Sequence, residues 1–326
     1  MRALFRVDSG RKIGGGHLFR CLVLADELAH RGASCAFACR PHEGALLDAV
    51  KARGHDVHAL SHARDVSCGV EADHGGWIGA RPEEDAAETV ELLERVRADW
   101  LVVDHYGLDA RWEQSVRKRF DVRALVIDDL ADRPHDCEVL LDQNLWPDAA
   151  ERYDGLVPAQ CRRLLGPRYA LLRGSGRARC APLPPCGTAL AFFGAEDPTG
   201  ECRKLVSAWL ALYGDRADAP VRLRVVAGLL NRDRAWLEEQ AAGSRGLSIT
   251  GWVDDLPDEL ARVRCAIGAA GGTTWERLAA GCESWVVAVA EHQRALAMHL
   301  VELGVAHRVG TQAATAPEDY VRCLRE

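Results

Sequence analysis

A run of three glycines followed by a histidine is the most chemically suggestive feature near the start of the chain. Gly14, Gly15 and Gly16 stand directly before His17 and follow a short apolar stretch. Glycine allows positive φ angles and a close approach of the backbone to a ligand, and the first N–H groups of a following helix have no partner within it. Such a loop suits an anion or a sugar. His17 is then either a base placed at the ligand or an ordinary residue that begins the helix.

A carboxylate, an imidazole and a phenol follow another apolar stretch, in the order Asp104, His105 and Tyr106. Tyr106 could hydrogen-bond a substrate hydroxyl or an attacking water, and Asp104 could orient water or sugar. The alternative is a structural turn in which Asp104 caps and Tyr106 packs. A later acidic run, 128–133, is interpreted as a capped turn with a surface ion pair, because hard-cation sites usually draw oxygen ligands from several segments.

Glycines followed by hydroxyl residues recur in the second half of the chain, at Gly271, Gly272, Thr273 and Thr274. Backbone N–H groups and threonine hydroxyls at a helix start would hold a diphosphate, whose negative charge the helix dipole also stabilises. Glu276 lies near the first turn and could accept hydrogen bonds from both hydroxyls of a ribose. The alternative for Glu276 is a capping box.

Two further polar residues, Glu291 and Gln293, follow the next expected strand. They could contact the donor sugar, because ligands of parallel sheets lie beyond the carboxyl ends of the strands. They could equally stabilise the start of their own helix.

None of these loops has the spacing of a cofactor or zinc site. The first lacks both the G-x-G-x-x-G of a dinucleotide fingerprint and the G-K-[ST] of a P-loop, which disfavours nicotinamide cofactors and NTP hydrolysis. The 12 cysteines are spread from Cys21 to Cys323, and the closest pairs lack the spacing of a zinc site. We therefore expect free thiols, no metal and no cofactor.

The composition favours small-molecule chemistry. The 326 residues suffice for two domains, and 48% hydrophobic with 27% charged residues is typical of a globular protein. No apolar run is long enough to cross a membrane, and a net charge of −7 gives no general attraction for nucleic acid. The N-terminus lacks the pattern of a signal peptide. We expect a cytoplasmic monomer that binds neither nucleic acid nor membrane.

Strand-like apolar runs alternate with helical patterns along the chain. That order predicts parallel sheets with crossover helices, and a stretch rich in Gly, Pro and Arg marks a linker. We predict an α/β protein with two Rossmann-like, doubly wound domains facing a central cleft, at residues 1–175 and 187–326, joined by a linker at 176–186. The expected strands are 3–7, 34–39, 56–60, 100–103, 124–127, 139–141, 189–193, 221–226, 247–250, 265–268 and 285–289. The expected helices are 17–31, 43–53, 83–98, 109–119, 201–212, 232–242, 256–262, 274–280 and 294–303.

Several ordered blocks of the sequence resemble the UDP-2,4-diacetamido-2,4,6-trideoxy-β-L-altropyranose hydrolases of pseudaminic acid biosynthesis, within a wider family of spore-coat-polysaccharide proteins. The resemblance extends over most of the chain. The blocks are residues 6–9, 13–17, 20–25, 103–106, 126–133, 141–144, 165–173 and 271–277.

The resemblance implies a GT-B-like fold and hydrolysis of a UDP-sugar at its anomeric carbon, with His17 as the base and Glu276 as a ligand of the nucleotide. We place the diphosphate at the second glycine-rich loop. Attack of water opposite the leaving UDP predicts inversion, and no metal is expected, because a diphosphate leaving group needs charge stabilisation more than protonation. Asp8 and Arg20 stand in the matched blocks and are predicted to contact the substrate. The N-terminal domain would thus carry the base, and the C-terminal domain would bind UDP.

The sequence departs from the family pattern on the donor side. Where the family tends to show Gly-Gly-x-Asp-Pro-Thr-Asn, this chain has Ala195 at the second position and Gly200 at the last, and His292 replaces an expected Asn. These changes bear on the identity of the sugar more than on the type of reaction. A glycosyltransferase of the same architecture is the main alternative, since fold does not fix function; a non-catalytic nucleotide-sugar sensor is another.

Overall fold

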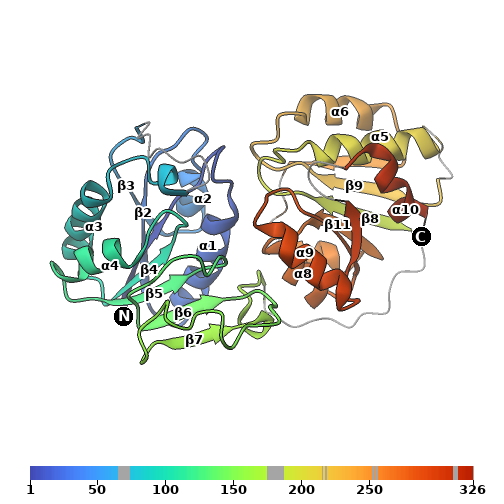
Figure 1. Ribbon diagram of the computed structural model, residues 1–326. Coiled ribbons are helices and arrows are strands. Elements are labelled where there is room, and N and C mark those ends of the chain that lie inside the picture. The colour runs from blue at the N-terminus through green and yellow to red at the C-terminus, as the bar shows by residue number, and fades with distance from the viewer. Residues whose placement is uncertain are drawn as a thin grey trace. The chain divides into compact units, whose positions relative to one another are not determined.

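The computed structural model of the protein describes residues 1–64, 74–174, 187–214, 216, 219–251, 253, 256–310 and 315–325. The chain forms two compact units, Met1–Leu171 and Leu172–Glu326 (Figure 1). The predicted linker, 176–186, lies outside the described residues. The predicted bounds of the two domains therefore stay predictions.

The N-terminal unit is built on a parallel sheet of seven strands in the order β3-β2-β1-β4-β5-β6-β7. Its strands are β1 (Arg2–Val7), β2 (Ser34–Cys39), β3 (Asp56–Ala59), β4 (Trp100–Asp104), β5 (Arg123–Ile127), β6 (Val139–Asp142) and β7 (Arg162–Leu165). Its helices are α1 (Gly16–His30), α2 (Leu47–Ala52), α3 (Pro82–Val96) and α4 (Ala110–Arg117), with short 3₁₀ turns at His74–Ile78 and Pro167–Tyr169.

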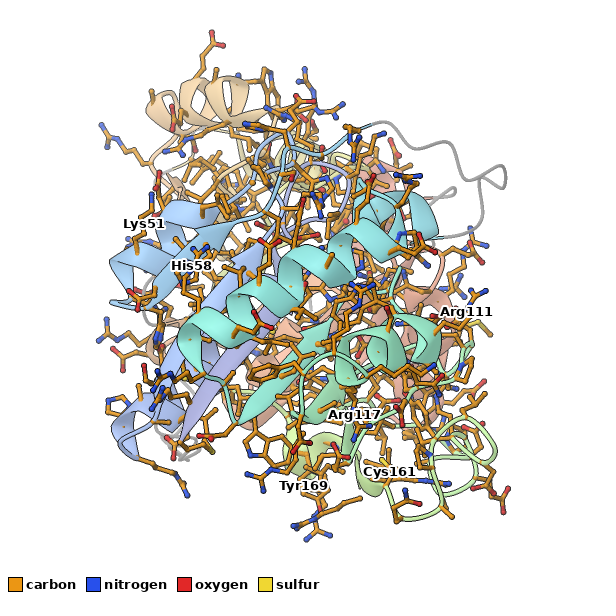
Figure 2. The ribbon with its side chains drawn as sticks, turned by 90° about the vertical axis from the view of Figure 1, so that its left-hand side faces the viewer. Lys51, His58, Arg111, Arg117, Cys161 and Tyr169 are labelled. Atoms are coloured by element: carbon orange, nitrogen blue, oxygen red, sulfur yellow. The ribbon has the colours of Figure 1, made fainter. Side chains whose placement is uncertain are left out.

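Both faces of this sheet are covered, as a doubly wound fold requires. Side chains alternate along β1, so that Phe5 and Val7 pack with Leu18 and Leu22 of α1, whereas Leu4 belongs to the core beneath α3 and α4. Figure 2 shows α3 and α4 lying across the second face. The central strands β2 and β4 are rich in apolar residues because both of their faces are buried.

The C-terminal unit repeats this plan with six parallel strands in the order β10-β9-β8-β11-β12-β13. Its strands are β8 (Thr188–Phe192), β9 (Arg222–Val226), β10 (Leu247–Thr250), β11 (Cys265–Ala269), β12 (Glu283–Val287) and β13 (His307–Gly310). Its helices are α5 (Glu201–Tyr213), α6 (Arg234–Ala242), α7 (Leu256–Leu260), α8 (Thr273–Ala279), α9 (Gln293–Glu302) and α10 (Val321–Arg325), with a 3₁₀ turn at Pro317–Tyr320.

The strand order places a switch point in each sheet. The chain leaves β1 toward one edge and later returns to add β4 on the other side, so that the loops after β1 and β4 diverge. The loops after β8 and β11 do the same in the second sheet. Ligands of open parallel sheets bind at these points, outside the carboxyl ends of the strands.

The predicted fold class is confirmed, with local differences. Strands β7 and β13 were not predicted; both are four-residue edge strands that carry arginine or histidine, and such strands show little apolar alternation. The helix expected over 43–53 is limited to Leu47–Ala52, because Gly44 adopts a φ of 74° and interrupts it. Within the described residues, no helix is long and apolar enough to span a membrane.

Candidate functional site

The glycine-rich loop joins β1 to α1 and begins with a small backbone bridge. Gly10 and Gly14 exchange hydrogen bonds of 3.1 and 2.7 Å between their backbones, and Gly14 has a φ of 79° that favours glycine. Gly15 precedes α1, and no side chain caps the helix there. A methyl group added at Gly14 or Gly16 would meet nothing within 4 Å. The loop therefore leaves open space next to the start of α1.

His17 lies in the first turn of α1 and is held by Asp104, the last residue of β4. The two residues are buried, and His17 Nδ1 lies 2.6 Å from Asp104 Oδ1. A carboxylate accepts the Nδ1–H, so the lone pair of the ring resides on Nε2. The arrangement is that of a base oriented by an acid, which favours the catalytic interpretation of His17 over the structural one.

Arg20, one turn further along α1, connects two carboxylates. It donates to Asp104 from Nε and Nη2 at 2.6 and 2.7 Å, and to Asp129 from Nη1 at 2.7 Å. Burial alone would raise the pKa of Asp104, but the charges and hydrogen bonds of Arg20 and His17 outweigh burial and hold that pKa well below its usual range. Asp104 is therefore ionised at neutral pH and stabilises a protonated His17.

Tyr106 lies beside His17 but donates its hydroxyl to Asp129, at 2.6 Å from Oδ2. Burial, with the negative charge of Asp129 added, raises the pKa of Tyr106 well above its usual value. The phenol edge faces His17 at 4.4 Å between ring centroids. Trp77 stacks on Tyr106 at 5.7 Å and meets His17 edge-on at 6.2 Å. Tyr106 and Trp77 thus form an aromatic wall next to the base.

Asp129 and Asn144 complete the cluster, and reasoning from the sequence missed both. Asn144 Nδ2 donates to Asp129 Oδ1 at 2.6 Å and to Asp142 Oδ1 at 2.9 Å. Asp129 follows β5 and Asn144 follows β6, so both lie at the edge of the sheet that carries Asp104. The run 128–133 does contain the expected turn, because Asp128 Oδ2 accepts from two backbone N–H groups. The signal that could have found Asp129 and Asn144 was their position directly after strands in matched blocks.

Asp8 does not join this cluster. It is fully buried, and Arg6 donates to both of its carboxylate oxygens at 2.6 and 2.9 Å. Asp85 accepts from Arg6 and from Arg40 in the same network. Asp8 Oδ1 also accepts from the backbone N–H of Arg40, directly after β2, at 2.6 Å. Asp8 therefore links the ends of β1 and β2, and its contact with substrate stays a prediction.

The second predicted site surrounds the start of α8. Gly271 and Gly272 form the turn after β11, and Thr273 begins the helix. Thr274 is completely buried, where its hydroxyl lies 3.3 Å from the carbonyl oxygen of Ala269. Thr273 is half-buried. The two threonines thus differ in what they can offer to a ligand.

Glu276 is bonded to Arg173 rather than to the start of its helix. Arg173 donates from Nε to Oε1 at 2.7 Å and from Nη2 to Oε2 at 2.9 Å. No side chain caps α8, so the capping-box alternative for Glu276 is not what the structure shows. Arg173 is a third residue that reasoning from the sequence missed, although it ends a matched block.

Glu291 and Gln293 lie at the start of α9 and have different partners. Glu291, two residues before the helix, is exposed, and its Oε2 lies 3.2 Å from Nε of Arg294 in the first turn of α9. Gln293 Oε1 accepts from the backbone N–H of Val289 at 3.1 Å, which fastens the end of the strand to the helix start. The structure therefore shows the local stabilising role for both residues, and their contact with a sugar stays a prediction.

Gly200, which stands where the family pattern has Asn, keeps a backbone conformation that Asn can also adopt. Asp197 accepts hydrogen bonds of 2.8 Å from the N–H groups of Glu201 and Cys202 at the start of α5. Gly200, directly before that helix, has a φ of 70°. Asparagine also tolerates this left-handed conformation, so the replacement removes a side chain without changing the path of the chain.

No group of three or more histidine, cysteine or acidic side chains in the described part of the chain could hold a metal ion. The carboxylates of the first site are instead bonded to Arg20, His17, Tyr106 and Asn144.

The chain matches one curated relative well. It is 33% identical over 173 residues to the UDP-2,4-diacetamido-2,4,6-trideoxy-beta-L-altropyranose hydrolase of Campylobacter jejuni subsp. jejuni serotype O:2, which is 53% of this chain and 52% of the relative. The match thus spans about half the length of the relative. No family model matches the chain. The relative carries the name of the family that the sequence blocks resemble, which confirms that resemblance.

Solved structures show the fold. The spinosyn rhamnosyltransferase SpnG is similar with a TM-score of 0.68 and 16% identity, over 100% of this chain and 91% of that one. The calicheamicin glycosyltransferase has a TM-score of 0.65 and 18% identity, over 99% and 89%. MurG of Acinetobacter baumannii has a TM-score of 0.60 and 15% identity, over 99% and 89%. These are glycosyltransferases of the GT-B fold, and the predicted GT-B-like fold is confirmed.

Proposed function

We propose that the protein hydrolyses a UDP-linked 2,4-diacetamido-2,4,6-trideoxy sugar to UDP and the free sugar. The observation that carries this proposal is the contact of 2.6 Å between His17 Nδ1 and Asp104, which leaves His17 Nε2 as the acceptor of a proton. The name of the Campylobacter relative supports the choice of substrate class.

The reaction needs one base and a site for the departing nucleotide. His17 Nε2 takes a proton from water while the water oxygen forms a bond to C1 of the sugar. The bond between C1 and the diphosphate oxygen breaks, and UDP leaves with the bonding electrons. A positioned base contributes about 10²–10⁴ in rate. Attack opposite to the leaving group inverts the configuration at C1.

Asp104 acts through His17 in this mechanism. It is completely buried and bonded to His17 and Arg20, so it orients the imidazole and stabilises its cationic form rather than contacting water. Tyr106 shapes the space beside the base. The open space at Gly14 and Gly16 gives the sugar access to His17.

UDP is assigned to the C-terminal unit. The diphosphate is bound by the loop from Gly271 to Thr274, where oriented N–H donors stabilise the charge that develops on the leaving group. Glu276 binds the ribose. Departure of a diphosphate requires charge stabilisation more than protonation, so the proposal includes no metal, and turnover in the presence of EDTA tests that part.

The experiment is to incubate the protein with several UDP-sugars, without acceptor, and to follow UDP release and the anomer formed by NMR. We expect release of UDP from a diacetamido-trideoxy sugar donor, with the inverted anomer appearing first. His17→Leu abolishes turnover but still binds UDP, which is measured by calorimetry. Full activity of that variant would overturn the assignment of the base.

A glycosyltransferase is the second candidate, because the solved structures of similar fold are glycosyltransferases. An acceptor hydroxyl then replaces water. Release of UDP only when an acceptor is added would establish this alternative, whereas UDP binding without any release would indicate a sensor.

A further inference from the structure

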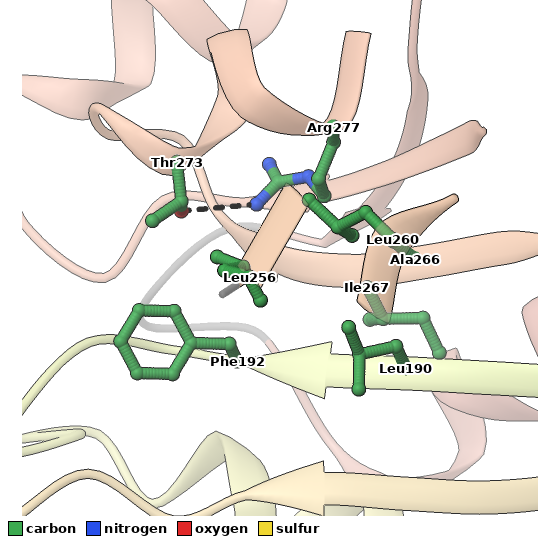
Figure 3. A pocket seen from close by; sticks show the side chains of 8 residues that line it. All are labelled: Leu190, Phe192, Leu256, Leu260, Ala266, Ile267, Thr273 and Arg277. Atoms are coloured by element: carbon green, nitrogen blue, oxygen red, sulfur yellow. Dashed lines mark hydrogen bonds between the residues drawn. The ribbon is translucent and has the colours of Figure 1, made fainter. Parts of the chain in front are cut away.

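Arg277 is a buried arginine directly behind the loop that we assign to the diphosphate. Its side chain donates from Nη1 to Thr273 Oγ1 at 3.2 Å and from Nη2 to Thr274 Oγ1 at 3.0 Å. It also donates from Nε to Ser284 Oγ at 2.9 Å and from Nη2 to the Ala269 carbonyl at 3.1 Å. Figure 3 shows the guanidinium reaching toward Thr273. All of these acceptors are neutral.

The other fully buried arginines among the described residues have carboxylate partners. Arg6 and Arg40 both donate to Asp85, at 2.7 and 2.8 Å. No carboxylate within the described residues forms an ion pair with Arg277. Its acidic neighbour, Glu276, has both oxygens bonded to Arg173. Arg277 is therefore a buried cation with no bonded counter-charge.

The apolar surroundings of Arg277 strengthen the electrostatic field of its guanidinium group. It lines a small apolar cavity of about 10 Å³ with Leu190, Phe192, Leu256 and others (Figure 3). Burial lowers the pKa of the Arg277 guanidinium to about 10, so the group keeps its charge at neutral pH. A charge acts over a longer range in such surroundings than in water.

Gly268 in β11 makes room for this cation. A methyl group there would lie 2.6 Å from Arg277 Nη1 and 2.4 Å from the carbonyl oxygen of Phe192. Glycine weakens a strand interior and often marks a close approach of another group. Here two groups approach, the guanidinium of Arg277 and the carbonyl oxygen of Phe192 in the neighbouring strand.

The hydrogen bonds of Arg277 determine what each threonine can do. A guanidinium only donates, so both hydroxyl oxygens act as acceptors toward it. The hydroxyl of Thr274 has the Ala269 carbonyl as its own acceptor at 3.3 Å. The hydroxyl of Thr273 has no hydrogen-bond acceptor among the described residues, and Thr273 is half-buried at the start of the helix. Its hydrogen is thus directed away from Arg277 and is available to an anion.

We infer that Arg277 is the positioning residue that makes this loop specific for a nucleoside diphosphate over the nucleoside. Its charge is balanced by the diphosphate, and it orients the Thr273 hydroxyl to donate to a phosphate oxygen. A buried charge without a partner is costly, and an anionic ligand supplies the partner. This inference rests on the proposed function, since it concerns the same nucleotide site.

The test compares the binding of UDP and uridine to the full chain by calorimetry. The variants are Arg277→Met, Arg277→Lys and Thr273→Val, and the control is Arg262→Met, which removes an exposed arginine paired with Asp258. We expect Arg277→Met and Thr273→Val to weaken UDP binding about 10- to 100-fold while uridine affinity stays unchanged. Arg277→Lys retains the charge and recovers part of the UDP affinity, and the control binds both ligands as the wild type does.

Each result decides between the two proposals. Equal loss of UDP and uridine affinity in Arg277→Met, or unchanged UDP affinity, overturns the inference while the hydrolase proposal stands. A wild-type protein that binds no UDP overturns both. Circular dichroism checks the fold of each variant, and Thr273→Val carries the test by itself if Arg277→Met does not fold.

Discussion

His17 and Asp104 come from segments 87 positions apart in sequence, yet His17 Nδ1 lies 2.6 Å from Asp104 Oδ1. Strands β1 and β4 are neighbours in the sheet, and Val7 is the register partner of Asp104. The helix that follows β1 therefore begins directly above the end of β4. The pair is a consequence of the strand order, because the crossover that separates β1 from β4 creates the switch point at which both residues lie.

Replacing Asp104 by Asn tests the role of this pair. An amide donates a hydrogen bond from its nitrogen, which favours the ring form of His17 with its proton on Nε2, where it cannot accept a proton from water. We expect kcat to fall by about 10²- to 10⁴-fold with UDP affinity unchanged. Steady-state kinetics and calorimetry measure the two quantities. A loss of UDP affinity in proportion to kcat would show instead that Asp104 supports the fold as a whole.

Arg20→Met removes the partner of one buried carboxylate, Asp104, and one partly buried carboxylate, Asp129. Asp104 and Asp129 both accept from this guanidinium, and an uncompensated buried charge costs about 3–5 kcal/mol in the free energy of unfolding. Urea denaturation measures that loss. Arg31→Met at the end of the same helix is the matched control, since its pair with Glu27 is exposed and is expected to contribute less than about 1 kcal/mol. Equal effects of both substitutions would contradict the prediction.

The sequence was sufficient to predict the fold and the positions of the loops. Strands with both faces buried are recognisable as apolar runs, as in β1 and β4. A loop that follows a parallel strand lies at the carboxyl-end edge of the sheet, where ligands bind. His17, Asp104 and Tyr106 could therefore be selected before any distance was known. Short polar edge strands such as β7 carry no comparable signal.

Pairing between distant side chains could not be predicted. Asp129 accepts hydrogen bonds from Tyr106 and Arg20 because β4 and β5 are neighbours in the sheet. The apolar pattern of a strand does not indicate which other strand lies beside it. The bond between Arg173 and Glu276 likewise joins residues 103 positions apart. Asp8 also follows a strand, but it is buried and bonded to Arg6, which the sequence did not indicate, and its contact with substrate stays a prediction.

Glu276→Ala is predicted to remove the preference for ribose over deoxyribose. A carboxylate that accepts from the ribose hydroxyls interacts equally with UDP and uridine, so both lose affinity, in contrast to the variants of Arg277. Wild-type protein binds UDP more tightly than 2′-deoxy-UDP, and Glu276→Ala reduces that ratio toward one. Calorimetry with the two nucleotides measures the ratio, and Glu238→Ala, which removes an exposed carboxylate paired with Arg234, serves as the control. A ratio that stays at the wild-type value in Glu276→Ala would place the ribose elsewhere.

Asp142 is predicted to make stability fall as pH rises through the weakly acid range. Burial, with the charge of Asp129 added, raises the pKa of Asp142 to about 7, whereas an unfolded aspartate has a pKa of about 3.9. Between these two pKa values Asp142 is protonated in the folded state and ionised in the unfolded state. The folded state thus binds one proton more than the unfolded state, and the free energy of unfolding decreases as the pH rises. Asp142→Asn cannot ionise and loses this dependence.

The measurement is urea denaturation of wild type and Asp142→Asn at several pH values between about 4 and 8. We expect the stability of the variant relative to wild type to increase with pH up to about pH 7 and to level off above it, because only wild type must ionise a buried carboxyl group at position 142. Tyr153 donates to Asp142 Oδ2 at 3.1 Å and Asn144 to Oδ1, and an amide retains an acceptor oxygen for only one of these two donors. The absolute stability at low pH is therefore lower in the variant, and the prediction concerns the slope with pH. Asp154→Asn, on the exposed partner of Arg163, is the control. A relative stability of Asp142→Asn that is constant with pH would mean that Asp142 is already ionised in the folded protein at low pH, held by Tyr153 and Asn144 despite its burial.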